Sequence, residues 1–230
     1  MKNDFGIIIV AGGSGSRYGE KNKLLEEIGG IPIIAHSPLN FRNLCPEEQI
    51  VVVCNPSCLE DYKYLIAKHV PNNSFSFITG GETRSDSVRN GLHFLKKFNI
   101  KYAAIHDAAR PLATQELMLK CLAEYIRKGS SIAAKKVTDT IKSVDSSMKI
   151  VSTIDRTKLW AMETPQVFAF EDILRAYDFV NANNLIVTDD AAAMEAMGKE
   201  VYLVENAEYN NKITYHWDLP LANFIYRSRT

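Results

Sequence analysis

The sequence predicts an α/β fold with a mostly parallel sheet, helices on both faces and a projecting β-hairpin arm. Three observations favour it: 230 residues suit one α/β domain, strand-like runs alternate with amphipathic stretches, and one segment departs from that alternation. Parallel neighbours need long crossover connections, and these place helices over both faces of a sheet. We therefore expect residues 1–230 to form a single Rossmann-like domain.

Six runs rich in β-branched or aromatic residues supply the predicted strands. They cover residues 5–10, 50–54, 75–78, 102–105, 131–137 and 201–204. Residues 85–98 and 114–128 carry apolar residues at helical spacing, and Thr114 and Gly129 provide a start and a stop for the second helix. Ligands of such sheets bind beyond the carboxyl ends of the strands, so the site is expected there.

The segment 131–160 shows no helical period. Its extended pieces, at 134–137, 140–144 and 150–154, surround a turn at residues 145–147, which predicts a hairpin arm over residues 134–160. A two-stranded ribbon is marginal alone in water, so the arm should fold onto its own domain or pack on a second copy of the chain. We expect a homodimer.

Charge and cysteine usage narrow the class of protein. Lysine plus arginine and aspartate plus glutamate each number 27, so no overall field favours nucleic acid or a membrane surface. The apolar run at residues 7–10 is far shorter than the roughly 20 residues of a membrane span, and Asp4 interrupts any signal-like stretch. Reduced thiols in a cytoplasmic protein are expected, because no zinc or redox spacing links Cys45, Cys54, Cys58 and Cys121.

A glycine-rich bend follows the first predicted strand, in the order Ala11, Gly12, Gly13, Ser14, Gly15, Ser16 and Arg17. Glycines let backbone N–H groups close on a phosphate, although the same residues would also serve a plain tight turn. The dinucleotide fingerprint fails because Tyr18 stands where a third small residue is needed, and no P-loop pattern is present. Arg17, Lys21 and Lys23 together suit a triphosphate, while either lysine taken alone would pass for a solvated surface charge.

These motifs and others downstream resemble a known family. The bend, followed by residues 23–25 and 29–33, is similar to the start of nucleotidyltransferases that join a nucleotide to a sugar or polyol phosphate. Further motifs resemble the 2-C-methyl-D-erythritol 4-phosphate cytidylyltransferase family and occur in its order, at residues 80–88, 106–111, 139–140, 155–156, 164–166, 188–190 and 211–212. Glu82 is a mild departure, since the family has an acidic residue there that is often aspartate.

The resemblance implies transfer of CMP from CTP to methylerythritol phosphate with release of pyrophosphate, in isoprenoid precursor synthesis. It places Arg17 and Lys23 at the transition state. The triphosphate is then held by Ala11, Gly12, Gly13 and Gly15, and the cytidine by Gly81 and Ser87. Such a reaction depends on positioning and on neutralising charge at the phosphates.

The same resemblance assigns the metal and the second substrate. Asp107 follows the predicted strand 102–105 and would hold Mg²⁺, or another divalent cation, with Ala108 beside it in the nucleotide site. The polyol phosphate would meet Arg156 and Lys212, both also placed among the catalytic residues, and the hydroxyl groups of Thr140, Thr164 and Thr188.

For five further residues the sequence offers structural readings. His106 is expected to be structural, because an ionised phosphate nucleophile needs no base. Arg84 and Asp86 fit either a nucleotide contact or an ion pair at a helix start. Asp189 or Asp190 is expected to cap a helix over residues 191–197.

Three alternatives differ in class or substrate. A ribitol 5-phosphate cytidylyltransferase would share the bend and most of the cations, but residues 108–109 and 188–191 look more like the methylerythritol group. A non-catalytic nucleotide-binding protein should have lost cations or the carboxylate, yet all are present. A dehydrogenase is disfavoured by the glycine spacing.

Overall fold

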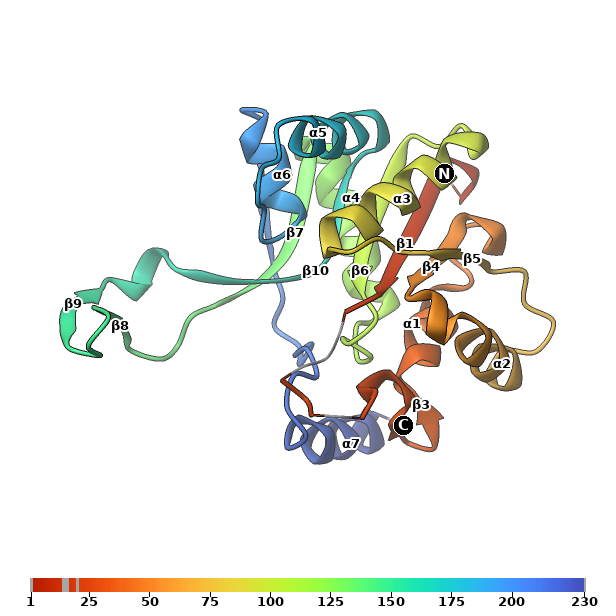
Figure 1. Ribbon diagram of the computed structural model, residues 1–230, viewed down its shortest axis with the longest axis horizontal. Helices are drawn as coiled ribbons and strands as arrows, with labels where there is room; N and C mark the ends of the chain where they lie inside the picture. Colours follow the sequence, from red (N-terminus) through yellow and green to blue (C-terminus); the bar gives the residue numbers. More distant parts are fainter. Residues whose placement is uncertain (1, 14–16, 20, 230) are drawn as a thin grey trace.

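The computed structural model describes residues 2–13, 17–19 and 21–229. Over these residues the strands form one large sheet in the order β11-β7-β10-β6-β1-β4-β5, and two small sheets, β2-β3 and β8-β9 (Figure 1). The strands are β1 Phe5–Ala11, β2 Glu27–Ile28, β3 Ile31–Pro32, β4 Ile50–Cys54, β5 Ser76–Thr79, β6 Tyr102–Asp107, β7 Ser130–Lys136, β8 Ile141–Val144, β9 Ile150–Ile154, β10 Trp160–Ala169 and β11 Leu203–Glu205.

Helices connect most of these strands. The α-helices are α1 Ile33–Phe41, α2 Leu59–His69, α3 Arg84–Leu95, α4 Gln115–Lys128, α5 Phe170–Ala182, α6 Asp190–Ala196 and α7 Asp218–Arg229. Short 3-10 turns are η1 Lys2–Asp4, η2 Lys23–Leu25, η3 Glu47–Gln49, η4 Pro56–Cys58, η5 Lys96–Phe98 and η6 Arg156–Lys158. Within the described ranges, no helix combines the length and the apolar character needed to cross a membrane.

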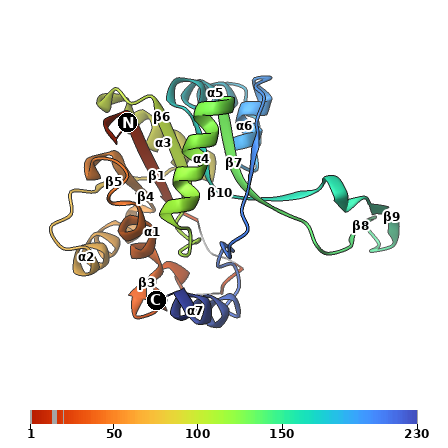
Figure 2. The same cartoon turned by 180° about the vertical axis from the view of Figure 1, so that it is seen from behind.

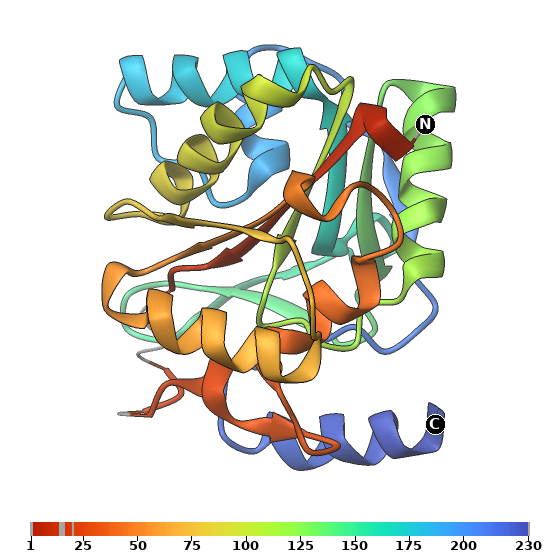
Figure 3. The ribbon, with the colours of Figure 1, turned by 90° about the vertical axis from the view of Figure 1, so that its right-hand side faces the viewer.

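The large sheet is buried on both faces. Side chains alternate across a strand, so Ile7 and Ile9 of β1 join the core beneath α1, α2 and α4, while Ile8 joins the core beneath α3, α5 and α6. Figure 3 shows these two helical layers on opposite sides of the strands, with α7 at the lower edge of the view. Because helices pack on both faces, the strands and the loops at their carboxyl ends are held in place, and the candidate site lies at those ends.

The predicted fold class is confirmed. Strands β4 and β9 match the expected ranges residue for residue, and the other predicted strands agree within two residues. Thr114 caps α4 through the N–H of Leu117, and Gly129 ends it with a positive φ of 89°. Four of the six pairings in the large sheet are parallel.

Strand β10 was not expected. The sequence analysis ends the arm at residue 160 and predicts no strand beyond it, whereas the structure inserts residues 160–169 antiparallel between β6 and β7. Pro165 obscures the strand, because proline lacks the N–H that a central strand donates, and the register shifts between Met162 and Gln166.

The arm departs from the body as expected. Strands β7 and β10 leave the large sheet together and lead to the hairpin β8-β9, which extends away from the other elements (Figures 1 and 2). Asp145 builds the predicted turn by accepting hydrogen bonds from the N–H groups of Ser147 and Lys149. Every side chain of β9 is exposed.

Candidate active site

A cavity of about 520 Å³ lies where the carboxyl ends of four strands meet. Ala11 at the end of β1 and Asp107 at the end of β6 line it, together with Asn55 after β4 and Gly81 after β5. This is the edge at which parallel sheets bind their ligands, because the loops that follow adjacent strands converge there. The structure thus places the glycine-rich bend and the expected metal carboxylate in one cavity.

Asp107 is a buried carboxylate held by two cations. Arg84 Nε lies 3.2 Å from its Oδ1 and Lys212 Nζ lies 2.7 Å from its Oδ2. Burial alone would raise the pKa of Asp107, but these neighbouring charges outweigh burial and hold it well below its ordinary range. Asp107 is therefore ionised at any physiological pH.

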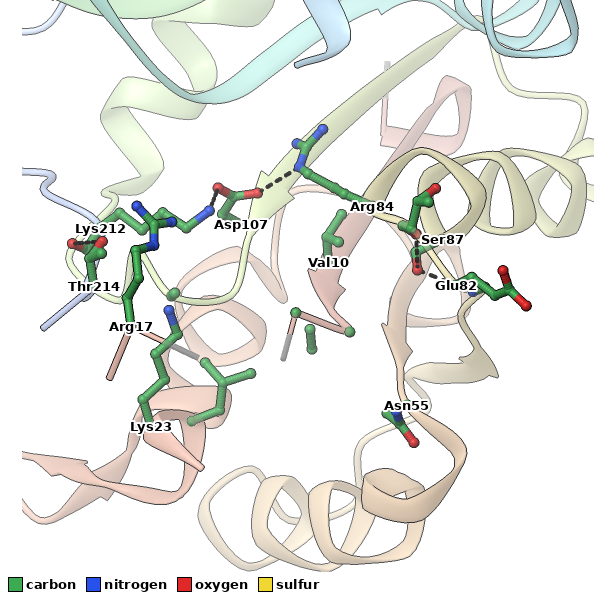
Figure 4. A pocket seen from close by; sticks show the side chains of 17 residues that line it. Val10, Arg17, Lys23, Asn55, Glu82, Arg84, Ser87, Asp107, Lys212 and Thr214 are labelled. Atoms are coloured by element: carbon green, nitrogen blue, oxygen red, sulfur yellow. Dashed lines mark hydrogen bonds and ion pairs between the residues drawn. The ribbon is translucent and has the colours of Figure 1, made fainter. Parts of the chain in front are cut away.

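Lysine and arginine side chains gather on the Asp107 side of the cavity. Figure 4 shows Arg17, Lys23 and Lys212 near one another on this side, and all three line the cavity. Lys23 is positioned by η2, which Asn22 caps, and its Nζ donates to the carbonyl of Ile213 at 2.8 Å. Burial and the neighbouring Lys212 and Arg17 charges lower the pKa of Lys23. Such a cluster is suited to bind several negative charges.

The opposite side of the cavity is lined by small polar groups and by one acidic side chain, that of Glu82. The Gly81 N–H donates to Ser87 Oγ at 3.2 Å, and that hydroxyl donates to the Thr83 carbonyl at 3.0 Å. A Cβ on Gly81 would lie 2.3 Å from the Cβ of Asp86, so glycine is required at this close approach. Figure 4 shows Ser87 and Asn55 here, away from the three cations. A charged triphosphate and a neutral base would thus find separate ends of one cavity.

The start of α3 resolves one of the open readings. Thr83 and Asp86 form a reciprocal capping box, with each side chain bonded to the other's backbone N–H. Arg84 turns instead toward Asp107 and Asp190. A helix begins here as expected. Asp86 bonds to Thr83, however, and forms no ion pair with Arg84.

His106 is structural, as expected. Its side chain is fully buried, with Nδ1 3.0 Å from Thr164 Oγ1 and Nε2 3.2 Å from the Arg110 carbonyl. Burial lowers the pKa of His106 to about 4, so the ring is neutral at pH 7. It does not line the cavity.

Two predicted contact residues lie behind the cavity wall rather than on it. Thr164 Oγ1 accepts a hydrogen bond from the Asp107 N–H at 3.0 Å, so this buried hydroxyl orients the backbone of Asp107. Ala108 has its side chain in the core, and its N–H donates to the Val10 carbonyl at 3.0 Å. Neither side chain therefore lines the cavity.

Three other predicted substrate residues lie outside the cavity. Thr140 and Arg156 belong to the arm, where Arg156 donates to the Thr138 carbonyl. Thr188 is exposed on the loop before α6, and the next residue, Asp189, caps that helix as expected. Gly15, predicted to hold the triphosphate, lies outside the described residues.

Sequence reasoning missed some residues that line the cavity. Asn55 directly follows a correctly predicted strand, so the rule about carboxyl ends would have found it. Thr214 lies just beyond Lys212 on an irregular segment, where no periodicity marks it.

The cavity fits a magnesium nucleotide better than a protein metal cage. Among the described residues no group of three or more histidine, cysteine or acidic side chains converges. Mg²⁺ prefers one or two carboxylates, with phosphate oxygens and water completing its shell. Asp107, placed beside the lysine and arginine side chains that line the cavity, offers such a carboxylate.

Comparison with known proteins agrees with this geometry. Residues 5–228 match the family described as IspD: 2-C-methyl-D-erythritol 4-phosphate cytidylyltransferase. The chain belongs to this family.

Curated relatives and solved structures share the match over nearly the whole chain. A 2-C-methyl-D-erythritol 4-phosphate cytidylyltransferase of Dictyoglomus thermophilum is 39% identical over 217 residues, covering 92% of each chain. One from Trichormus variabilis is 41% identical over 225 residues, covering 97% of this chain and 98% of the relative. The structure of 4-diphosphocytidyl-2C-methyl-D-erythritol synthase from Anaerococcus prevotii superposes with a TM-score of 0.81 at 28% identity, covering 97% of this chain and 98% of that one.

Membership of the 2-C-methyl-D-erythritol 4-phosphate cytidylyltransferase family confirms the resemblance drawn from the motifs. It places the chain among nucleotidyltransferases rather than dehydrogenases.

Proposed function

We propose that this chain transfers CMP from CTP to 2-C-methyl-D-erythritol 4-phosphate and releases pyrophosphate. One observation carries the proposal: Arg17, Lys23 and Lys212 converge with Asp107 on a single cavity beside the glycine-rich bend. Relatives that carry the name of this activity match the chain almost end to end.

The proposed reaction is a displacement at phosphorus. A phosphate oxygen of the polyol phosphate attacks the α-phosphorus of CTP, and the bond to pyrophosphate breaks in line. The nucleophile is already ionised, so no base is required, in keeping with a neutral and buried His106. Arg17 and Lys23 would neutralise charge on the α-phosphate, and Lys212 would face the incoming phosphate.

Lys23 is suited to this work by its surroundings. Burial and the nearby Lys212 and Arg17 lower its pKa in the chain without ligand. Bound phosphates would oppose all three effects, because negative charge favours the protonated amine. Lys23 is therefore more fully protonated, and so more effective at neutralising phosphate charge, when the anionic substrates are bound.

Asp107 is the residue we propose to hold Mg²⁺. When bound, the ion supplies positive charge that neutralises phosphate oxygens and orients the triphosphate. Thr164 and the two cations around Asp107 keep its carboxylate aimed at the cavity.

We also propose a homodimer in which the arm, residues 134–160, packs on a second copy of the chain. Residues 1–230 would form one nucleotidyltransferase domain, and the protein would work in the cytoplasm. Exposed apolar side chains on both strands, including Val144, Ile150 and Val151, support such packing. The four cysteines are free thiols, which fits a reducing compartment.

The test is product formation by the purified chain. CTP and methylerythritol phosphate with Mg²⁺ should release pyrophosphate and an equal amount of a CDP-linked polyol, identified by ³¹P NMR. Faster release with ribitol 5-phosphate would reassign the substrate. Tight CTP binding without release at any metal concentration would favour the non-catalytic alternative.

A further inference from the structure

Arg84 bridges two carboxylates that come from different parts of the chain. Its Nη1 and Nη2 lie 2.8 and 2.9 Å from the two carboxylate oxygens of Asp190, and its Nε lies 3.2 Å from Asp107 Oδ1. Arg84 begins α3, Asp190 begins α6 and Asp107 ends β6. One planar guanidinium therefore ties two helices to the strand end that carries the proposed metal ligand. Figure 4 shows its contact with Asp107.

Asp190 anchors this bridge from inside the protein. Its side chain is 0% exposed, does not line the cavity, and accepts a further hydrogen bond from the Tyr177 hydroxyl at 2.5 Å. Burial and the Asp190 charge raise the pKa of Tyr177, so that hydroxyl stays protonated and donates. Arg84 is thus held in position by a buried anchor that is not itself part of the cavity wall.

The two cations on Asp107 are held very differently. Arg84 has three hydrogen bonds in a fixed fork, and two of them go to a buried partner. Lys212 reaches Asp107 Oδ2 with one ammonium on a flexible stem and keeps 35% of its side chain exposed. Lys212 can therefore leave for an anionic substrate while Arg84 stays on Oδ1, which frees Oδ2 without releasing the carboxylate.

Stability alone does not account for such an arrangement. Apolar residues of similar volume often replace a buried ion pair with no loss of stability, because desolvation offsets the Coulomb attraction. The same helix α3 also carries Arg89, which meets Asp178 of α5 at 2.9 Å, half exposed and away from the cavity. That second pair provides a matched control.

We infer that Asp190, through Arg84, is a positioning residue that keeps the Asp107 carboxylate aimed at the metal nucleotide when Lys212 turns to the second substrate. The inference rests on the proposed function. Tyr177 supports Asp190 in the same role.

The primary test is Asp190→Asn, which keeps the shape and removes the charge. Calorimetry would measure the affinity for CTP in the presence of Mg²⁺ and in the presence of EDTA. Steady-state kinetics would measure the Mg²⁺ concentration that gives half-maximal activity. Groups that orient a metal ligand are worth about 10- to 100-fold, so we expect the Mg²⁺ enhancement of CTP affinity and kcat each to fall by at least tenfold. The KM for the polyol phosphate should change little, and Asp178→Asn should match the wild type.

A second variant separates positioning from folding. Arg84→Met, Tyr177→Phe and Asp190→Leu together leave no unpaired buried charge, so the chain should fold as judged by circular dichroism and thermal unfolding. We expect the folded triple variant to stay deficient in Mg²⁺ enhancement, whereas wild-type values would overturn the inference. Tyr177→Phe alone keeps every charge, should show a smaller shift in the same direction, and carries the test if the other variants do not fold.

The outcomes distinguish this inference from the proposed function. A wild-type chain that binds Mg·CTP but uses another polyol phosphate would change only the substrate, because calorimetry still reports on Asp190. A wild-type chain that neither binds CTP nor releases pyrophosphate would overturn both. A folded Asp190→Asn chain with unaltered Mg²⁺ enhancement would overturn only the positioning role.

Discussion

The cavity and the arm both carry predicted substrate residues, but they hold them in opposite ways. At the cavity, Lys23, Lys212 and Asp107 come from distant segments and are joined by hydrogen bonds to one another or to backbone. In the arm, Arg156 bonds to the carbonyl of Thr138, a neighbour in the same ribbon, and the strand side chains are largely exposed. The cavity is thus organised within one chain, whereas the relation of the arm residues to a site depends on the homodimer proposed above.

Lys23→Ala should have the largest effect, because it removes a cation from the organised region. Loss of one donor that stabilises transition-state charge costs about 10²- to 10³-fold in kcat, measured by pyrophosphate release. Lys21→Ala is the matched control, since Lys21 is exposed and does not line the cavity. A folded Lys23→Ala chain with near-normal turnover would remove Lys23 from the mechanism.

Arg156→Ala tests the arm directly. A charged hydrogen bond to phosphate contributes about 1.5–3 kcal/mol, so we expect the KM for the polyol phosphate to rise about 10- to 100-fold while the KM for CTP holds. An unchanged KM for the polyol phosphate would exclude the arm from substrate binding.

Mixing these two variants, at a polyol phosphate concentration well below the KM of Arg156→Ala, sharpens the comparison. If each arm serves its partner, a mixed dimer of Lys23→Ala and Arg156→Ala has one intact site, and random mixing restores about a quarter of wild-type activity. If each arm serves its own body, no intact site forms and activity stays low.

The pH dependence of stability should come in part from the buried ring behind the cavity. The pKa of His106 is about 4 in the folded chain and about 6.5 once the ring is exposed by unfolding, so the unfolded chain binds the proton more readily. Stability is therefore full above about pH 6.5 and declines as pH falls toward 4, by about 2 kcal/mol between pH 7 and pH 5 from this group. Urea unfolding at both pH values should show this decline, and His106→Gln should reduce it. An equally steep decline in His106→Gln would assign it to other groups.

Thr114→Ala should have the smallest effect and one confined to stability. Thr114 caps α4 away from the cavity, and loss of such a cap costs about 1 kcal/mol in unfolding free energy. Thermal unfolding should register the loss, Thr114→Ser should recover most of it, and kcat should match the wild type. A fall in kcat would show that α4 communicates with the site.

Local patterns sufficed where a residue's neighbours in sequence decide its place. Asp107 was expected at a strand end because residues 102–105 are apolar and β-forming, and the structure puts it there. The Asp145 turn and the Thr114 cap were likewise read from a few adjacent residues. The grouping of Arg17 and Lys23 beside the bend follows from their closeness along the chain.

Contacts between distant segments were beyond such reasoning. Arg84 and Asp190 are 106 positions apart, and nothing local distinguishes their ion pair from a solvated charge or a helix cap. Strand β10 was missed because Pro165 argues against a central strand, although the ladder resumes on both sides of it. Lys212 was placed only by family resemblance, since its irregular segment has no period.

The cavity also joins the first segments of the chain to the last ones. Lys23 bonds to the Ile213 carbonyl, 190 positions later, and the Gly29 N–H donates to Asn223 of α7, 194 positions later. During synthesis, β1 and its glycine-rich bend leave the ribosome long before these partners exist. A nascent chain can therefore build much of its sheet early, but the wall of the cavity is incomplete until translation has passed Thr214.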